Sequence, residues 1–494
     1  MRAPALAALL AAPAVAQNPA FTDFSHRLPE HVYRGGWEFF VGGGVAAFDC
    51  SGNNLPDLFL AGGEGPSLLL RNQGDMVFVP MVLDITDVTG AFPLDIDNDG
   101  VLDLFVLRVG PNMVLRGLGD CAFEDATKAL GIDPGNAWST AFAAWWQDGA
   151  SRPTVFVGNY VDRENPEGPF FACDDNQILR PIAEGWQSAP FGPGYCPLSV
   201  LAARDARERM TLRLSNDRHY YVRGGHEQMW DIRERRYLGA EDGWPDLMLW
   251  GMGIASRDIT GNGRADVYLT SMADQILQLA QDDGTYRTAP FEMGHTAHRP
   301  FTGDDGRPST GWHAQWGDVN NNSRADLFVA KGNVDQMPDL AMADPNNLLI
   351  QNPNGQFEEM AHIAGVADPA RSRGAALVDL DGDGRLDLVV VNRRAPARLY
   401  RNETERTGNW LKVNLHQRGA NRFAIGARVY VETSDTHQWQ ELSIGGGHAG
   451  GQLVPLHFGI GTALEARLRI IWPDGYESLH AVRQINQTID ITRD

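Results

Sequence analysis

The chain has 494 residues, of which 43% are hydrophobic and 21% are charged, and its formal net charge is -21. This acidic balance argues against a nucleic-acid partner, because phosphate backbones attract basic surfaces. Beyond the N-terminus there is no run of about 18 apolar residues, the length that a membrane-spanning helix requires. The length allows several ordinary domains, or one large repeat domain with a smaller one.

The first sixteen residues are predicted to be a secretory signal peptide. Met1 and Arg2 give a short positive start, residues 5–12 are apolar, and residues 14–16 form a small-x-small cleavage site. Cleavage before Gln17 would place the mature chain outside the cytoplasm, where disulfides are stable. We therefore expect a secreted or periplasmic protein without an integral membrane segment.

An acidic loop between two short apolar strands recurs along residues 17–405. The first residues of the copies are Asp49, Asp95, Trp146, Ala203, Asp258, Asp318 and Asp379, spaced roughly 46 to 61 residues apart. The copies that begin at Trp146 and Ala203 keep the flanking strands but lose the acids. Regularly repeated short strands separated by turns are typical of a propeller, so seven copies predict an all-β, seven-bladed β-propeller.

Five of these loops have the composition of a calcium site. Oxygen-bearing side chains stand at loop positions 1, 3 and 5, a backbone carbonyl is available at position 7, and Asp stands at position 9. Position 6 is Gly, Asn or Ser, and we expect a positive φ there. An Asp-Gly hairpin turn explains a single copy without any metal. Recurrence of Asp at positions 1 and 9 in all five favours calcium.

We therefore predict about five Ca²⁺ sites. Their ligands are Asp49, Ser51, Asn53, Leu55 and Asp57; Asp95, Asp97, Asp99, Val101 and Asp103; Asp258, Thr260, Asn262, Arg264 and Asp266; Asp318, Asn320, Asn322, Arg324 and Asp326; and Asp379, Asp381, Asp383, Arg385 and Asp387. The loops that begin at Asp95 and Asp379 carry four carboxylates each and the others two. Because ligand charge controls affinity, these two loops are expected to bind calcium most tightly.

A long insertion, about residues 162–200, separates the third and fourth repeats. Residues 165–195 within it are expected to be too rich in glycine and proline to form regular structure alone. Cys173 and Cys196 share this segment and are predicted to pair, which leaves Cys50 with Cys121.

Polar turns follow the strands that come after the acidic loops. If the loops lie on one face of a propeller, these turns reach the opposite face near its axis and form a candidate ligand funnel. Its predicted residues are Asn159, Asn216, Asp217, His219, Lys331, Asn333, Asn392 and Arg393. A hydrated rim of ordinary loops would have the same composition.

The seventh repeat ends at Asn402 without the aromatic, acidic outer strand that closes other repeats, such as residues 357–361. The missing pattern occurs at the other end of the mature chain, at residues 21–25. An unpaired sheet edge exposes backbone donors and acceptors. We therefore predict that the N-terminal strand joins the seventh repeat.

Residues 406–494 are predicted to be a small β-rich domain. It contains Asn409-Trp-Leu-Lys-Val-Asn-Leu, Ile425-Gly-Ala-Arg-Val-Tyr-Val and Ile471-Trp-Pro-Asp-Gly475. These segments resemble the ASPIC/UnbV domain, and residues of about 20 to 405 resemble FG-GAP/VCBS repeats. Together they are similar to a secreted, bacterial member of the cartilage acidic protein family. Within the C-terminal domain, between its motifs at residues 425–431 and 471–475, residues 445–451 are expected to form a flexible turn.

The resemblance implies a calcium-binding extracellular propeller, and catalytic motifs such as GxSxG, HExxH or a P-loop do not occur. We therefore predict a binding or adhesion protein for an extracellular protein or glycan. The alternative is an extracytoplasmic enzyme, glycan-directed, that uses the funnel. An enzyme predicts a titratable pair in the funnel, for example a carboxylate beside His219, and a binding module does not.

Overall fold

The computed structural model describes residues 18–168, 171–217, 225–296, 306–335 and 337–494. The predicted signal peptide and His219 lie outside these residues. Nearly all regular structure in them is β-strand, and no helix among them is long and apolar enough to cross a membrane. The short helices are α1 (Ala361–Ala364) and the 3-10 turns η1 (Ser25–Arg27), η2 (Trp37–Phe39), η4 (Ala240–Asp242) and η5 (Phe291–Met293).

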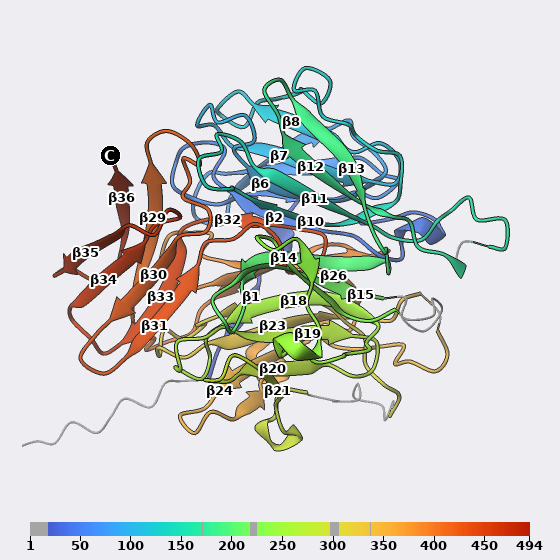
Figure 1. Cartoon of the computed structure of the whole chain (residues 1–494). Helices are drawn as coiled ribbons and strands as arrows, with labels where there is room; N and C mark the ends of the chain where they lie inside the picture. Colours follow the sequence, from blue (N-terminus) through green and yellow to red (C-terminus); the bar gives the residue numbers. More distant parts are fainter. Residues whose placement is uncertain (1–17, 169–170, 218–224, 297–305, 336) are drawn as a thin grey trace, which may run out of the picture.

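Strands that follow one another in sequence pair antiparallel and form successive, propeller-like sheets (Figure 1). The strands are β2 (Val45–Phe48), β3 (Asp57–Leu60), β4 (Ser67–Asn72) and β5 (Phe78–Leu83); β6 (Val88–Leu94), β7 (Asp103–Arg108), β8 (Met113–Gly117) and β9 (Phe123–Asp125); β10 (Ser139–Trp145), β11 (Thr154–Asn159), β12 (Asn176–Pro181) and β13 (Trp186–Phe191); β14 (Pro197–Arg204), β15 (Met210–Asn216), β16 (Gln228–Asp231) and β17 (Arg236–Tyr237). They continue with β18 (Gly251–Arg257), β19 (Asp266–Ser271), β20 (Ile276–Ala280) and β21 (Tyr286–Thr288); β22 (Gly311–Gly317), β23 (Asp326–Lys331), β24 (Asn347–Gln351) and β25 (Phe357–Glu359); and β26 (Arg371–Val378), β27 (Asp387–Arg393) and β28 (Arg398–Asn402).

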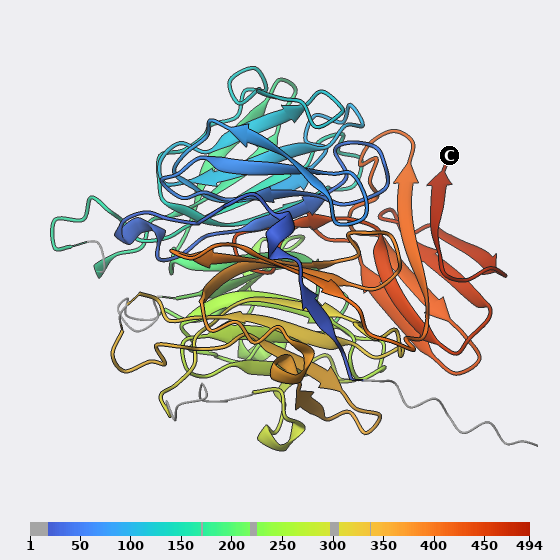
Figure 2. The same ribbon diagram turned by 180° about the vertical axis from the view of Figure 1, so that it is seen from behind.

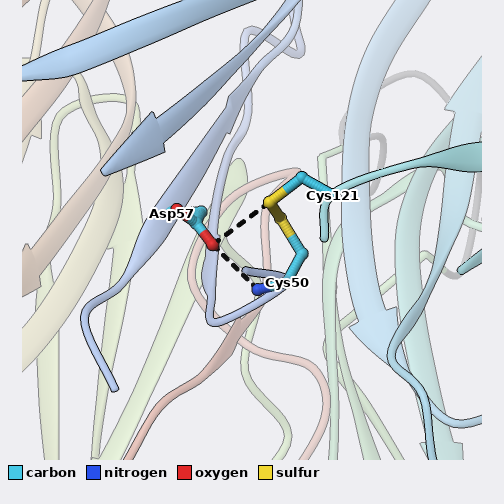
Figure 3. A group of neighbouring side chains, drawn as sticks. All are labelled: Cys50, Asp57 and Cys121. Carbon is cyan, nitrogen blue, oxygen red and sulfur yellow. Dashed lines mark hydrogen bonds between the residues drawn. A yellow bond between two sulfur atoms is a disulfide. The ribbon is translucent and has the colours of Figure 1, made fainter. Parts of the chain in front are cut away.

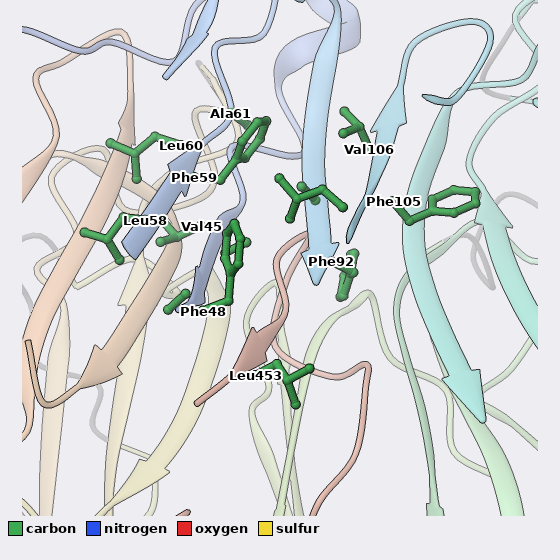
Figure 4. Close-up of a cluster of buried hydrophobic side chains, with 14 of the residues drawn as sticks. Val45, Phe48, Leu58, Phe59, Leu60, Ala61, Phe92, Phe105, Val106 and Leu453 are labelled. Carbon is green, nitrogen blue, oxygen red and sulfur yellow. The ribbon is translucent and has the colours of Figure 1, made fainter. Parts of the chain in front are cut away.

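The first strand of each sheet packs against the first strand of the next. β2 contacts β6, the contacts pass through β10, β14, β18 and β22 to β26, and β26 contacts β2 again. Small residues let these inner strands approach closely, as in the buried segment Val45-Ala-Ala-Phe48. Between the sheets, the Phe142 ring stacks on Phe92 with centroids 4.9 Å apart and lies tilted against Phe105 at 4.7 Å. Phe92 and Phe105 are among the buried side chains in Figure 4.

The N-terminal strand joins the last of these sheets, as the sequence predicted. β1 (Phe21–Asp23) pairs antiparallel with β28, with Phe21 opposite Asn402 and Asp23 opposite Tyr400. Phe21 is buried against the apolar residues of β27 and β28. Segments 381 residues apart in sequence therefore complete one sheet. β1 is the dark blue strand in Figure 2.

Deleting residues 17–28 is expected to destabilise this sheet. The deletion exposes the backbone N–H and C=O groups of β28 that pair with β1. It also removes the buried Phe21 side chain, whose burial alone contributes roughly 1.5–3 kcal/mol. Hydrogen exchange measures the effect. Amides of β28 should exchange faster, whereas those of β12, which pairs with β11 and β13 far from the deletion, should keep their protection. Unchanged exchange in β28 would contradict the prediction.

The C-terminal strands form two further sheets with a core of their own, beside the earlier ones (Figures 1 and 2). One contains β29 (Asn409–Gln417), β33 (Leu456–Gly461) and β36 (Gln487–Arg493). The other contains β30 (Arg428–Glu432), β31 (His437–Glu441), β34 (Ala466–Ile471) and β35 (Glu477–Val482). The core between them includes Leu411, Val429, Phe458 and Trp472.

Residues 444–453, here called the glycine segment, do not form a flexible turn of the C-terminal sheets. Their end is β32 (Gln452–Leu453), which pairs parallel with β2, and Leu453 joins the core of the first two sheets (Figure 4). The residues before it form bridges with the inner strands, through Ala144, Leu201, Ile254 and Ala91 in turn. The expectation of a flexible turn is therefore wrong, because this segment fills the space between the inner strands.

Close backbone approach explains the glycines of this region. A Cβ on Gly90 of β6 would lie 1.5 Å from the carbonyl oxygen of Ala449. His448, between the bridged residues Gly447 and Gly450, is fully buried. Its Nε2 accepts the Gly42 N–H at 3.2 Å, so the proton stands on Nδ1, which lies 3.2 Å from the Met252 carbonyl. Burial lowers the pKa of His448 to about 3, which keeps the ring neutral.

Much of the segment predicted as an insertion, residues 162–200, belongs to a regular sheet. Within residues 162–200, β12 and β13 are regular strands that complete the sheet of β10 and β11. Residues 165–195 thus contain regular structure after all, but do not form it alone, because cross-strand pairing on β11 provides the partners that composition does not reveal. Both predicted disulfides are confirmed, Cys50–Cys121 with Cα atoms 4.7 Å apart and Cys173–Cys196 with Cα atoms 5.2 Å apart.

Candidate metal centres

Each of the five acidic loops connects the first strand of a sheet to the second, so all five lie at the same end of the sheets. We name them by their first residue, the 49, 95, 258, 318 and 379 loops, each nine residues long. In every loop the Asp at position 1 accepts the backbone N–H of position 6, at 2.7 to 3.1 Å. Position 6 has a positive φ in all five, from 64° to 93°, as predicted.

The side chain at position 5 closes a second turn, because its Oδ1 accepts the N–H of position 7 at 2.8 to 2.9 Å in each loop. Position 4 also has a positive φ, which the sequence analysis missed. The signal was present, since this position is always Gly or Asn: Gly52, Asn98, Gly261, Asn321 and Gly382.

The Asp at position 9 has a structural role besides the predicted one as ligand. It is the first residue of the second strand, and its Oδ2 accepts the N–H of position 2 at 2.9 to 3.0 Å. Its Oδ1 accepts the N–H of the last residue of the third strand at 2.7 to 3.0 Å. In the 95, 318 and 379 loops both oxygens keep a lone pair for a cation, whereas Oδ2 of Asp57 and of Asp266 also accepts the N–H of position 3. One buried carboxylate thus ties the second and third strands to the loop.

Two loops bring carboxylates especially close together. One oxygen from each of Asp95, Asp97 and Asp99 lies within 4.8 Å of the others, and the same holds for Asp379, Asp381 and Asp387. A third group, Cys50, Asp57 and Cys121, contains the disulfide (Figure 3), so its sulfurs are not thiolate ligands.

Burial disfavours the ionised form of these carboxylates. Burial first, and then the neighbouring Asp99, raise the pKa of Asp95 to about 6, and burial raises that of Asp103 to about 7. Burial raises the pKa of Asp266 to about 6 and that of Asp387 well above its ordinary value. A buried anion of this kind is stabilised either by a proton or by a cation. The donor set, hard oxygens around a tight turn, fits calcium.

In one of the acid-poor loops, an arginine neutralises the carboxylate instead. Between β14 and β15, Arg209 binds Oδ2 of Asp205 through Nε at 2.8 Å and through a terminal nitrogen at 2.6 Å. Asp205 also accepts the backbone N–H of Arg207 at 2.9 Å. In this loop the Arg209 guanidinium therefore neutralises the carboxylate, as a metal ion could in the five acidic loops.

The C-terminal sheets cover several of the loops. Trp439 Nε1 donates to Asp258 at 3.2 Å, Gly461 N–H donates to the Asn321 carbonyl at 2.9 Å, and His457 Nε2 lies 2.9 Å from the Gly384 carbonyl. A cavity of about 250 Å³ remains between these sheets and the inner strands. Its lining includes Arg257, Gln315, Lys412, Glu441, Gln452 and His457.

The predicted ligand funnel is not open in the described part of the chain. Asn159, Asn216, Asp217, Lys331, Asn333, Asn392 and Arg393 are all buried, with at most 7% of their surface exposed. Lys331 forms an ion pair with the equally buried Asp344 at 3.0 Å, and Asn392 donates to the Pro396 carbonyl at 3.0 Å. Because these side chains hold their own loops, the prediction of an accessible funnel is wrong for them.

Two protein-family models match parts of the chain. The FG-GAP-like repeat model matches residues 49–106 and 333–390, and the ASPIC and UnbV model matches residues 417–494. Cartilage acidic protein 1 of Homo sapiens is 33% identical over 375 residues, which cover 72% of this chain and 46% of that protein. The Xenopus tropicalis protein of the same name is 30% identical over 142 residues, covering 27% of this chain and 22% of that protein. The chain spans less than half the length of these relatives.

Solved structures resemble the chain more distantly. BBS1N, crystallised in complex with ARL6DN, aligns with a TM-score of 0.46 and 11% identity, covering 79% of this chain and 99% of that one. PorZ of Porphyromonas gingivalis aligns with a TM-score of 0.39 and 10% identity, covering 91% of this chain and 59% of that one. Both TM-scores lie below 0.5.

Proposed function

Because this chain combines FG-GAP-like repeats with an ASPIC and UnbV domain and is homologous to cartilage acidic protein 1, we propose that it is an extracellular or periplasmic interaction module. Its two disulfides support that location, because disulfides persist in oxidising compartments. In this proposal residues 1–16 act as the signal peptide. The partner is an extracellular protein or glycan.

The architecture we propose is a seven-bladed β-propeller over residues 17–405 with a C-terminal β domain over residues 406–494. Each blade would be one of the sheets that begin with β2, β6, β10, β14, β18, β22 and β26. The contact between β26 and β2 and the completion of the last sheet by β1 support a closed ring. Radial repetition of this kind leaves only short, protected sheet edges.

We propose further that the five acidic loops bind Ca²⁺. The observation that carries this is their common geometry: the same hydrogen bonds at positions 1, 5 and 9 recur around buried carboxylates whose pKa values are raised. Side chains at positions 1, 3, 5 and 9 and the carbonyl at position 7 would hold the ion. Bound calcium would supply the positive charge that the cluster lacks.

Burial of the funnel residues that the structure describes, which do not include His219, supports an interaction role over catalysis at the axis. A glycan-directed enzyme of the predicted kind needs reachable titratable groups there, whereas Lys331 and Asp344 neutralise each other away from solvent. The surface that meets the partner would then lie on the outer loops rather than in the axis.

Calorimetric titration of the chelated protein with calcium tests the metal proposal. We expect about five sites, and the double substitution Asp95→Asn and Asp99→Asn should remove one of them. Asp148→Asn is the matched control, because Asp148 is exposed in an acid-poor loop. Absence of calcium binding at millimolar concentration would refute the proposal. A glycan array probed with the calcium-loaded protein then distinguishes glycan from protein partners.

A further inference from the structure

A lysine from the C-terminal sheets reaches into the 379 loop. Lys412 of β29 places its Nζ 2.6 Å from Oδ2 of Asp379, and the two side chains are 7% and 3% exposed. Asp379 is position 1 of the loop, and the same oxygen accepts the Gly384 N–H at 3.0 Å. A buried ammonium thus contacts the carboxylate that begins a proposed calcium site, from a residue 33 positions further along the chain.

The 95 and 379 loops, which carry equal numbers of carboxylates, differ in their counter-ions. Near the 379 loop, Arg401 lies 2.8 Å from Asp381, and Arg385 contacts Asp383, in addition to Lys412. Among the described residues, Arg116 alone forms ion pairs with the acids of the 95 loop, at 2.8 Å from Asp97 and 3.8 Å from Asp99, while Arg422 lies beside Gly100 of that loop without such a pair. Three cations therefore oppose the acids of one loop and one cation those of the other.

The position of the ammonium is set by packing. Trp410 of β29 lies where a side chain on Gly384 would stand, since a Cβ there would be 1.8 Å from its ring. The Lys412 ammonium lies 5.5 Å from that ring, and β29 pairs with β33, whose His457 contacts the Gly384 carbonyl. Because the strand is held on both sides of the lysine, the ammonium stays beside Asp379 as long as the C-terminal sheets are docked.

We propose that Lys412 is a built-in competitor of calcium at the 379 loop. This inference rests on the proposed calcium sites and assigns the regulation of one of them. The ammonium neutralises Asp379 and repels a divalent cation at short range in a buried setting, so this loop binds calcium more weakly than the 95 loop. Calcium binding at the 379 loop then works against the docking of β29, which links metal occupancy to the C-terminal sheets.

Substitution of Lys412 by Met tests the proposal, since Met keeps the apolar stem and removes the charge. The assay uses Tb³⁺ as a calcium probe, excited through Trp410 beside the loop, and displacement of Tb³⁺ by calcium gives the affinity. The whole chain carries Asp95→Asn and Asp99→Asn, so that the other acid-rich loop is silent, and Trp439→Phe, so that the 258 loop has no indole beside it. Lys412→Met should bind calcium roughly tenfold more tightly than the parent. Lys412→Arg and the distant Lys128→Met should bind as the parent does.

In chelator, Lys412→Met should also melt at a lower temperature than the parent, because Asp379 loses its counter-ion. Calcium should remove this difference in melting temperature, because the bound ion neutralises Asp379. If the Met variant does not fold, Lys412→Gln, which still donates a hydrogen bond, provides the same comparison. Equal or weaker calcium binding by the uncharged variants, in a parent that binds calcium, would overturn the competition and leave the calcium sites intact. Absence of binding in every variant would overturn the calcium sites and, with them, the inference.

Discussion

Replacing Gly90 by alanine is expected to destabilise the whole protein severely. The new Cβ would lie 1.5 Å from the Ala449 carbonyl oxygen and 2.6 Å from its carbon. Both atoms are backbone, held by the pairing of Gly450 with Ala91 and of β32 with β2. Since neither side can yield alone, we expect a loss of about 3 kcal/mol or more in the free energy of unfolding. Urea unfolding followed by tryptophan fluorescence measures it.

Gly306→Ala is the matched control. A Cβ at Gly306 meets nothing within 4 Å, so its effect should remain within about 0.5 kcal/mol. If Gly90→Ala unfolded at the same urea concentration as the parent, the glycine segment would not lie between the inner strands. Because this segment reaches five successive inner strands, we also expect the repeats and the C-terminal sheets to unfold together in one transition.

Removal of calcium is expected to lower the melting temperature by on the order of 10 °C. A ligand at a hundredfold excess over its Kd adds about 2.7 kcal/mol for each site that only the folded state offers. Without the cation, buried carboxylates such as Asp95 and Asp103 repel one another in the loops. Thermal unfolding in excess chelator, compared with millimolar calcium, measures the difference. Identical melting curves would refute calcium binding to the loops.

The pH dependence in chelator gives an independent check. The folded-state pKa values of Asp95 and Asp103, about 6 and about 7, lie above those of an unfolded aspartate. Their contribution to stability is therefore present below about pH 4 and is lost as the pH rises through 6 to 7. In chelator the protein should melt at a higher temperature at pH 5.5 than at pH 7.5. Calcium should reduce this difference, because it takes the place of the protons.

The repeat pattern, the loop geometry, the N-terminal strand and the disulfides could all be predicted from the sequence. Each depends on a local arrangement that a few residues specify. Asp at positions 1 and 9 of a nine-residue loop determines which N–H groups it can reach, and β28 lacked an outer strand that only residues 21–25 could provide. The positive φ at position 4 was equally readable from its Gly or Asn.

The tertiary structure alone decided the glycine segment, the counter-ions of the 379 loop and the strands β12 and β13. A run such as Gly445-Gly-Gly-His448 has the same composition in a mobile turn as beside a crowded backbone, and only the approach of Gly90 distinguishes the two. Likewise, Lys412 meets Asp379 because two sheets dock, and no spacing in the sequence encodes that contact. Local patterns determine turns and registers, whereas charge neutralisation and close packing depend on partners that folding alone brings together.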